Sequence, residues 1–133
     1  MTIFADASAL IAVIAGEPEA DDLADRLDAD KARLCSALSV WETVAGLRHS
    51  YTFSIASARR TVQLYLDAAA FRYADIGERE FAIAADAYAH YGKGRHLAAL
   101  NMGDCFAYAC AKSNQAKLLF KGAGFSKTDI AAA

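Results

Sequence analysis

Four short runs of apolar, β-favouring residues are spaced along the chain, with helical segments between them. A tight turn cannot join two parallel strands, because the connection must cross back over the sheet, and a helix is the usual crossover. The pattern therefore predicts an α/β fold in which helices flank both faces of a central, mainly parallel sheet of four or five strands. The expected strands are residues 2–6, 32–35, 71–76 and 116–120, with residues 125–130 as a last edge strand or a loop. The expected helices are residues 9–15, 17–27, 40–48, 54–70, 78–91 and 104–113.

Length and composition indicate one compact domain over residues 1–133 that needs no disulfides. Hydrophobic residues make up 56% of the chain and charged residues 23%, with one proline, which excludes a disordered protein. No apolar run reaches the ~20 residues that a membrane span needs, and the N-terminus lacks the order of a secretory signal, so we expect a cytoplasmic protein. Cys35, Cys105 and Cys110 lack metal-site spacing and are expected to be reduced and mostly buried.

Asp6 ends the first expected strand and stands where a helix begins. In open α/β sheets, ligands bind outside the carboxyl ends of the strands, so this carboxylate is a candidate for chemistry. Aspartate is also a favoured residue at helix N-termini, and Asp6 could simply be a cap.

Two further acids are expected at the same end of the sheet. Glu42 falls in the first turn of the helix after the second strand, and Asp104 starts the helix before the fourth strand. Each has a structural alternative, because Ser39 and Glu42 fit an S-x-x-E capping box and Asp104 would favour the positive end of its helix. Together, three converging carboxylates suit Mg²⁺ or Mn²⁺, which bind oxygen ligands and leave positions for a substrate phosphate.

Several basic residues could contact phosphate around such a pocket, although the net charge of −2 gives no general sign of a nucleic-acid-binding protein. Two glycines enclose the most basic stretch, which is residues 92–96. The candidates for substrate contact are Arg48, Lys93, Arg95, His96 and Lys121. The alternative for each is an ordinary solvated side chain.

Motifs in a fixed order resemble the PIN-domain toxins of bacterial type II toxin–antitoxin systems, the VapC ribonucleases. They are Asp6-Ala-Ser-Ala-Leu, Trp41-Glu-Thr, Tyr91-Gly-Lys-Gly-Arg-His, Leu100-Asn-Met-Gly-Asp-Cys-Phe-Ala-Tyr108, Leu118-Leu-Phe-Lys-Gly and Phe125-Ser-Lys-Thr-Asp. Each is weak alone, but their order and spacing are specific, and the resemblance covers nearly the whole chain.

The resemblance implies a PIN-like domain that hydrolyses RNA phosphodiester bonds as a Mg²⁺- or Mn²⁺-dependent endoribonuclease. The family acids correspond to Asp6, Glu42 and Asp104, with Asp6 and Asp104 as direct metal ligands and Glu42 acting through water or as general base. Ser8 corresponds to the small polar residue beside the metal, or it caps the helix.

The resemblance also implies a cognate VapB-type antitoxin that inhibits the enzyme, and a homodimer within a larger toxin–antitoxin assembly. A basic residue of the antitoxin's tail is expected to enter the acidic pocket and satisfy its carboxylates. Apolar residues of that tail are expected to lie along the early helices, near Leu10, Ile14 and Trp41.

One position departs from the family pattern. Members of this subgroup usually carry an acid immediately before the phenylalanine of the last motif, where this chain has Gly124 followed by Phe125. Asp129 follows four residues beyond that phenylalanine, and we assign it a supporting role. Because this fourth acid is absent, the sequence does not predict a second metal ion or full activity.

Two other functions are compatible with such a fold. One is a PIN-like binding module whose catalysis is impaired at Gly124. The other is a receiver-type phospho-acceptor domain, with Asp75 and Lys121 in its phosphorylation site, although Asp6 lacks the adjacent acid that such a site needs.

Overall fold

The computed structural model describes residues 1–133 and contains one parallel sheet of four short strands. The strands are β1 (Thr2–Ala5), β2 (Ala32–Cys35), β3 (Phe71–Tyr73) and β4 (Lys117–Leu119). Their order across the sheet is β3-β2-β1-β4, and every neighbouring pair is parallel. The prediction of a mainly parallel sheet is thus confirmed, with four strands.

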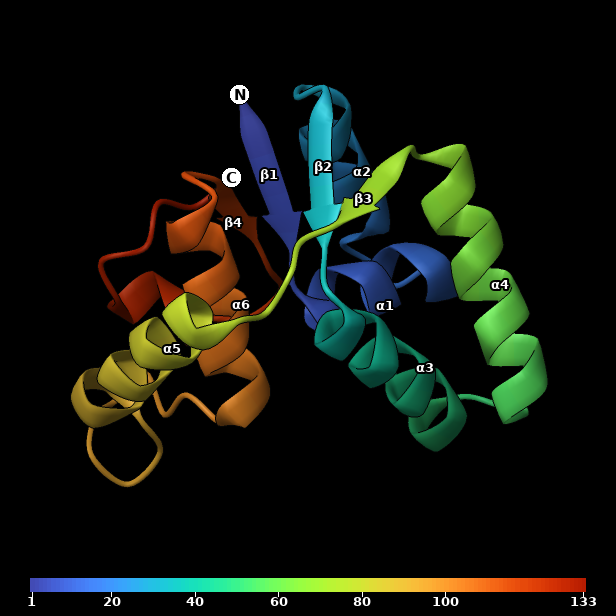
Figure 1. The fold of residues 1–133 in the computed structure, drawn as a ribbon. Coiled ribbons are helices and arrows are strands. Elements are labelled where there is room, and N and C mark those ends of the chain that lie inside the picture. The colour runs from blue at the N-terminus through green and yellow to red at the C-terminus, as the bar shows by residue number, and fades with distance from the viewer.

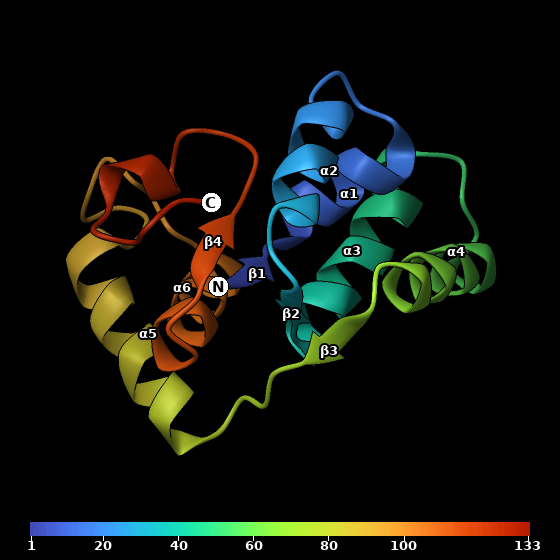
Figure 2. The ribbon, with the colours of Figure 1, turned by 90° about the horizontal axis from the view of Figure 1, so that it is seen from above.

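Helices cover both faces of the sheet, as Figures 1 and 2 show. Helices α5 and α6 lie on one side, and α1 to α4 lie on the other. The helices are α1 (Ala7–Ala15), α2 (Ala20–Asp28), α3 (Ala37–Ser50), α4 (Ile55–Ala68), α5 (Glu78–Tyr91) and α6 (Met102–Ser113), followed by the short 3-10 helix η1 (Phe125–Lys127). All six expected α-helices are therefore present, with shifts of a few residues at their ends.

Residues on β1 alternate between two apolar layers. Phe4 packs with residues of α5 and α6 in one core cluster, whereas Ala5 joins a cluster with residues of α1, α3 and α4. Ile3 belongs to a third cluster with Leu23 and Leu27 of α2. Because helices cover both faces of the sheet at β1, its residues Ile3, Phe4 and Ala5 are all apolar and buried, and β1 is held in the centre of the molecule.

The C-terminal segment contacts the edge of the sheet a few residues further along the chain than expected. Residues 125–127 form η1 instead of a strand, and Ala132 makes an isolated parallel bridge with Leu118. The backbone N–H of Leu118 donates to the Ala131 carbonyl at 2.9 Å. The edge of β4 is therefore covered at residues 131–133, outside the expected range of 125–130.

The three cysteines agree with the expectation of buried, reduced side chains. Cys35, Cys105 and Cys110 are all free and buried, and burial raises the pKa of the Cys35 thiol to about 12. No helix is long and apolar enough to cross a membrane.

Candidate functional site

Asp6 stands at the junction of β1 and α1, where it is both a helix cap and a buried carboxylate. Its side chain is only 5% exposed. Oδ2 accepts hydrogen bonds from the backbone N–H of Ser8 at 3.0 Å and from the Ser8 hydroxyl at 2.6 Å. This bonding begins α1 at Ala7, two residues earlier than expected. The Asp6 carboxylate therefore caps α1 and is at the same time the candidate functional group.

Ser8 links Asp6 to the loop after β4. Its hydroxyl donates to Asp6 and accepts a hydrogen bond from the backbone N–H of Lys121 at 3.0 Å. The loop that follows β4 is thereby attached to the end of β1.

Asp104 lies on α6, in its first turn. The helix begins at Met102 instead of at Asp104, because Asn101 is the cap. The backbone N–H of Asp104 donates to Asn101 Oδ1 at 2.9 Å, and Asp104 Oδ2 accepts from the backbone N–H of Asn101 at 3.0 Å. This reciprocal pair is a capping box that fixes the carboxylate at the helix start.

Glu42 is not a capping residue, contrary to the alternative considered for it. Helix α3 begins at Ala37 with a capping box between Ser36 and Ser39, so Glu42 lies in the second turn and not in the first. Its carboxylate lies against Gly103 of α6, where a Cβ atom would overlap it. A glycine at this position is therefore what allows the carboxylate to approach the start of α6.

A pocket of about 160 Å³ joins these elements at the carboxyl ends of β1 and β4. Asp6 and Asp104 contribute its carboxylates and Lys121 its only cation. Gly124, where the family pattern has an acid, lies on the wall of the same pocket. The lining residues are Asp6, Ser8, Leu100, Asp104, Lys121, Gly124 and Phe125. We call this the acidic pocket.

Burial raises the pKa of all three acids, and neighbouring carboxylates raise the pKa of Asp6 and Glu42 further. Burial, opposed by the Ser8 hydrogen bonds and aided by the Asp104 charge, raises the pKa of Asp6 to about 6. Burial and the charges of Asp6 and Asp104 raise the pKa of Glu42 to about 7, and burial raises the pKa of Asp104. Like charges that are crowded and partly desolvated resist ionisation, so the site favours a compensating cation.

Comparison with known proteins identifies the family. The sequence model of the PIN domain matches residues 3–131. A VapC ribonuclease from Mycobacterium bovis is 40% identical over 126 residues, which cover 95% of this chain and 94% of the relative. A ribonuclease VapC from Mycolicibacterium smegmatis is 39% identical over 127 residues, or 96% of each chain. The chain belongs to the VapC family of PIN-domain proteins.

A solved structure supports the fold. The structure of VapBC2 from Rickettsia felis, bound to a DNA fragment from their promoter, aligns with a TM-score of 0.77 over 100% of this chain and 98% of the other. At 13% identity this likeness concerns the fold alone. The PIN-like architecture predicted for this VapC-family chain is thus confirmed.

Only one of the five basic candidates lines the acidic pocket, and that is Lys121. Lys93 lines an apolar pocket between α5 and α6, and Arg95 lies over the ring of Tyr88 on α5, 5.7 Å from its centroid. His96 accepts the backbone N–H of Ala98 at Nδ1 and so shapes its own loop.

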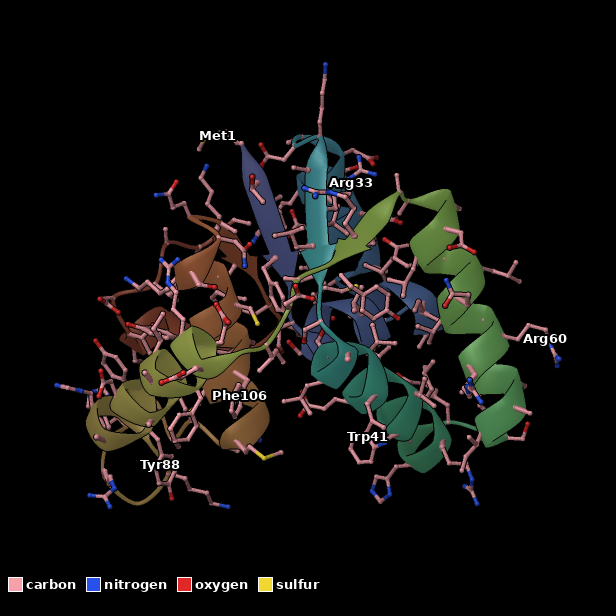
Figure 3. All side chains as sticks on the ribbon, viewed as in Figure 1. Met1, Arg33, Trp41, Arg60, Tyr88 and Phe106 are labelled. Carbon is pink, nitrogen blue, oxygen red and sulfur yellow. The ribbon has the colours of Figure 1, made fainter.

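Arg48 lies on the other side of the molecule. It lines a groove of about 650 Å³ between α3 and α4, together with Trp41. Figure 3 shows Trp41 on α3, with Tyr88 and Phe106 on the opposite pair of helices. Arg48 and Lys93 therefore belong to two separate hollows and not to the rim of the acidic pocket.

Asp129 does not line the acidic pocket. Its Oδ1 accepts the hydroxyl of Tyr108 at 2.5 Å, and its Oδ2 pairs with Lys112 Nζ at 3.2 Å. These contacts attach the C-terminal segment to α6, and they lower the pKa of Asp129. The structure therefore gives Asp129 a role in holding the chain end instead of replacing the acid missing at Gly124.

The receiver interpretation is incompatible with the sheet order. Asp75 follows β3, and Lys121 follows β4, and these strands are the two opposite edges of the sheet. With two strands between them, the segments are separated by about 14 Å. No shared phosphorylation site can form from these two residues.

The structure adds residues that the sequence patterns did not single out. Gly103 makes room for Glu42, and Asn101 fixes Asp104. Glu17 and Glu19, on the loop between α1 and α2, both pair with Lys121. The Asn-x-x-Asp spacing is a visible capping signal, but nothing in the sequence pairs the α1–α2 loop with the loop after β4.

The donor atoms of this site fit a hard divalent cation. No three His, Cys, Asp or Glu side chains come close enough together to hold a metal ion among themselves. Mg²⁺ usually keeps several waters and takes one or two carboxylates plus phosphate oxygens, so Asp6 and Asp104 in one pocket are a sufficient set. The absence of imidazole and thiolate donors from the pocket lining disfavours zinc.

We expect Gly103→Ala to lower the pKa of Glu42 without destabilising the fold. The new methyl group displaces a flexible carboxylate, which moves it away from Asp6 and Asp104, while alanine is the better helix former by about 1 kcal/mol. A carboxyl-detected NMR titration measures the pKa. Gly46→Ala is the matched control, because its methyl group meets the side chain of Ile11 instead of an acid. A Glu42 pKa that stays near 7 in Gly103→Ala contradicts the contact.

We also expect the metal-free protein to lose stability as the pH rises from about 5 to about 8. Folded Asp6 and Glu42 retain protons up to pKa values of about 6 and about 7, whereas the unfolded groups release them near pH 4. The folded state therefore binds more protons in this window and is favoured at its acid end, by on the order of 1 to 3 kcal/mol. Glu17 and Asp129 have lowered pKa values. Their effect on the free energy of unfolding therefore changes with pH only below this window and stays constant within it. Urea unfolding at each pH measures how steeply the free energy of unfolding falls with pH. Asp6→Asn should make this slope smaller, and an equal slope in that variant contradicts the assignment.

Proposed function

We propose that this protein is a Mg²⁺- or Mn²⁺-dependent endoribonuclease, the toxin of a type II toxin–antitoxin system. The observation that carries the proposal is the acidic pocket, in which the buried Asp6 faces Asp104 at the carboxyl end of the central strand. The relatives named VapC ribonuclease, at about 40% identity over nearly the whole chain, support it. We place the protein in the cytoplasm, with cellular RNA as its substrate.

Asp6 and Asp104 would hold the cation, which, when bound, polarises a phosphoryl oxygen and lowers the pKa of a coordinated water. Ser8 fixes the carboxylate of Asp6 by donating its hydroxyl hydrogen to Oδ2. The Asn101 capping box fixes the carboxylate of Asp104. Both acids are thus held in place before substrate arrives, which reduces the reorganisation that the reaction requires.

Glu42 is suited to accept the proton of the attacking water. A general base works best when its pKa lies near the working pH, and burial with its acidic neighbours raises the pKa of Glu42 to about 7. Glu42 does not line the acidic pocket itself, so it acts from the side of α3, beside the start of α6. Lys121 is the one cation on the pocket wall, and we assign it a contact with a substrate phosphate at the pocket rim.

The proposed partner is a VapB-type antitoxin, as in the VapBC2 complex from Rickettsia felis, bound to a homodimer of this chain. Its tail cannot use Leu10, which lies on the buried side of α1 and is fully enclosed in the core, so that part of the sequence-based expectation is wrong. Trp41 is 67% exposed and lines the groove between α3 and α4. We therefore place the apolar part of the tail in that groove, with a basic residue in the acidic pocket.

Asp6→Asn tests the catalytic role. The change keeps the shape of the side chain but removes a charge, so RNA cleavage with Mn²⁺ should fall by at least about a hundredfold. The folded state should be equally or more stable, because repulsion within the pocket decreases. Asp129→Asn is the control, since that carboxylate lies elsewhere and its loss should leave cleavage largely unchanged. Cleavage by purified Asp6→Asn at a near wild-type rate overturns the proposal.

Gly124 favours a second candidate function, an RNA-binding module with weak catalysis. Its position on the pocket wall means that the missing acid would have faced the cation. We expect Gly124→Asp to tighten Mn²⁺ binding by about threefold to thirtyfold. The new Cβ would lie 3.1 Å from the Ala98 carbonyl oxygen, a tight fit that a small loop shift can relieve.

Calorimetric titration with Mn²⁺ measures this effect. Ala123→Asp adds the same charge one residue away, outside the pocket lining, and serves as the control. Equal affinity in Gly124→Asp and wild type would show that a fourth carboxylate has no place in this site. If tighter binding is accompanied by faster RNA cleavage, the wild-type chain is an enzyme limited at position 124.

A further inference from the structure

Lys121 lies on the wall of the acidic pocket, but its ammonium group is directed away from the acids. Nζ donates to Glu17 Oε1 at 2.7 Å and lies 3.3 Å from Glu19 Oε2. Its ion pairs are with these two residues and not with Asp6 or Asp104. The single cation of the pocket is thus paired with acids that lie outside it.

The backbone of Lys121 is fixed close to Asp6. Its N–H donates to Ser8 Oγ, and the same hydroxyl donates to Asp6 Oδ2. A lysine side chain is a flexible stem with a compact charge at its end. From this position the ammonium group has the pocket carboxylates within reach, and their mutual repulsion would favour its entry.

Glu17 is held in place on the loop between α1 and α2, which also carries Glu19. Gly16 ends α1 with a left-handed backbone, and the Glu17 N–H donates to the Ala12 carbonyl at 2.9 Å, as in a Schellman motif. The Glu17 side chain is only 18% exposed, and it also accepts the hydroxyl of Tyr51. These contacts give Lys121 a fixed anionic partner at the pocket rim.

We propose that Glu17 and Glu19 are positioning residues that hold the Lys121 ammonium group at the rim of the acidic pocket and prevent it from neutralising Asp6 and Asp104. This inference rests on the proposed metal site, and it concerns what keeps that site available to a cation. Without the two glutamates, Lys121 turns inward, forms charge-assisted hydrogen bonds with the pocket acids, and competes with Mn²⁺.

A general charge effect predicts a different pattern of affinities. Removing two glutamates makes the neighbourhood less negative and weakens Mn²⁺ binding wherever Lys121 points. In that case the effect of removing Lys121 is the same with and without the glutamates, because distant charges act additively. If the ammonium group moves into the pocket, removing it matters much more once the glutamates are gone.

A double-mutant cycle with Mn²⁺ binding as the readout separates the two. Calorimetry is carried out on wild type, E17Q/E19Q, K121M and E17Q/E19Q/K121M, with folding checked by circular dichroism and urea unfolding. We expect E17Q/E19Q to weaken Mn²⁺ binding by about tenfold or more, and K121M to restore it by a similar factor in that background. In the wild-type background K121M should change the affinity by less than about threefold.

A variant of equal charge completes the design. D21N/D25N removes two exposed carboxylates from α2 and should weaken binding by no more than about threefold, since salt screens charges that are exposed to solvent. An equal effect of K121M in both glutamate backgrounds, or an equal loss in D21N/D25N and E17Q/E19Q, overturns the positioning role while leaving the metal site intact. If the wild-type protein binds no Mn²⁺, or if Asp6→Asn binds it with equal affinity, the proposed metal site and this inference are both overturned.

Discussion

The buried carboxylate of Asp6 is the constraint on which the arrangement of the chain depends. An ionised group at the end of a central strand costs several kcal/mol to desolvate unless hydrogen bonds and a counter-charge compensate. The Ser8 backbone and hydroxyl supply the hydrogen bonds, and the same hydroxyl accepts the backbone of Lys121. One side chain thereby sets the start of α1 and fixes the loop after β4. The elements that satisfy Asp6 are also those that enclose the acidic pocket.

Much of the fold was predictable because local signals and tertiary packing agree. The central strand is apolar where helices cover it, as Phe4 and Ala5 show, and Gly16 ends α1 at the residue expected from its type. The errors at the starts of three helices come from caps. Asp6 and Asn101 extend their helices toward the N-terminus, and the serine pair at positions 36 and 39 does the same for α3. Because Ser39 forms its capping box with Ser36, Glu42 does not have the capping role that its spacing suggested.

The positions of Asp6 and Asp104 were predictable, but the positions of most of the basic candidates were not. Asp6 and Asp104 are placed by strand and helix ends, whose positions along the sheet follow from topology. Lys93, Arg95 and His96 belong to a loop, and their directions are decided by Tyr88, Tyr91 and the backbone of Ala98. Asp129 was equally unpredictable, because Tyr108 and Lys112 approach it only in the folded chain. The pairing of Glu17 with Lys121 depends on two loops that lie far apart in sequence.

The sheet order has a consequence for the synthesis of this protein. The central strand β1 is made first, but one of its two neighbours, β4, is made almost last, and Asp104 belongs to the helix just before it. A chain that is still emerging from the ribosome therefore contains Asp6 and Glu42 but has neither the second pocket acid nor the strand that closes this side of the sheet. Because domains fold as units once their sequence has emerged, the acidic pocket assembles only when translation of the domain is nearly complete. A fragment of this chain that ends before α6 lacks Asp104 and therefore has no complete acidic pocket.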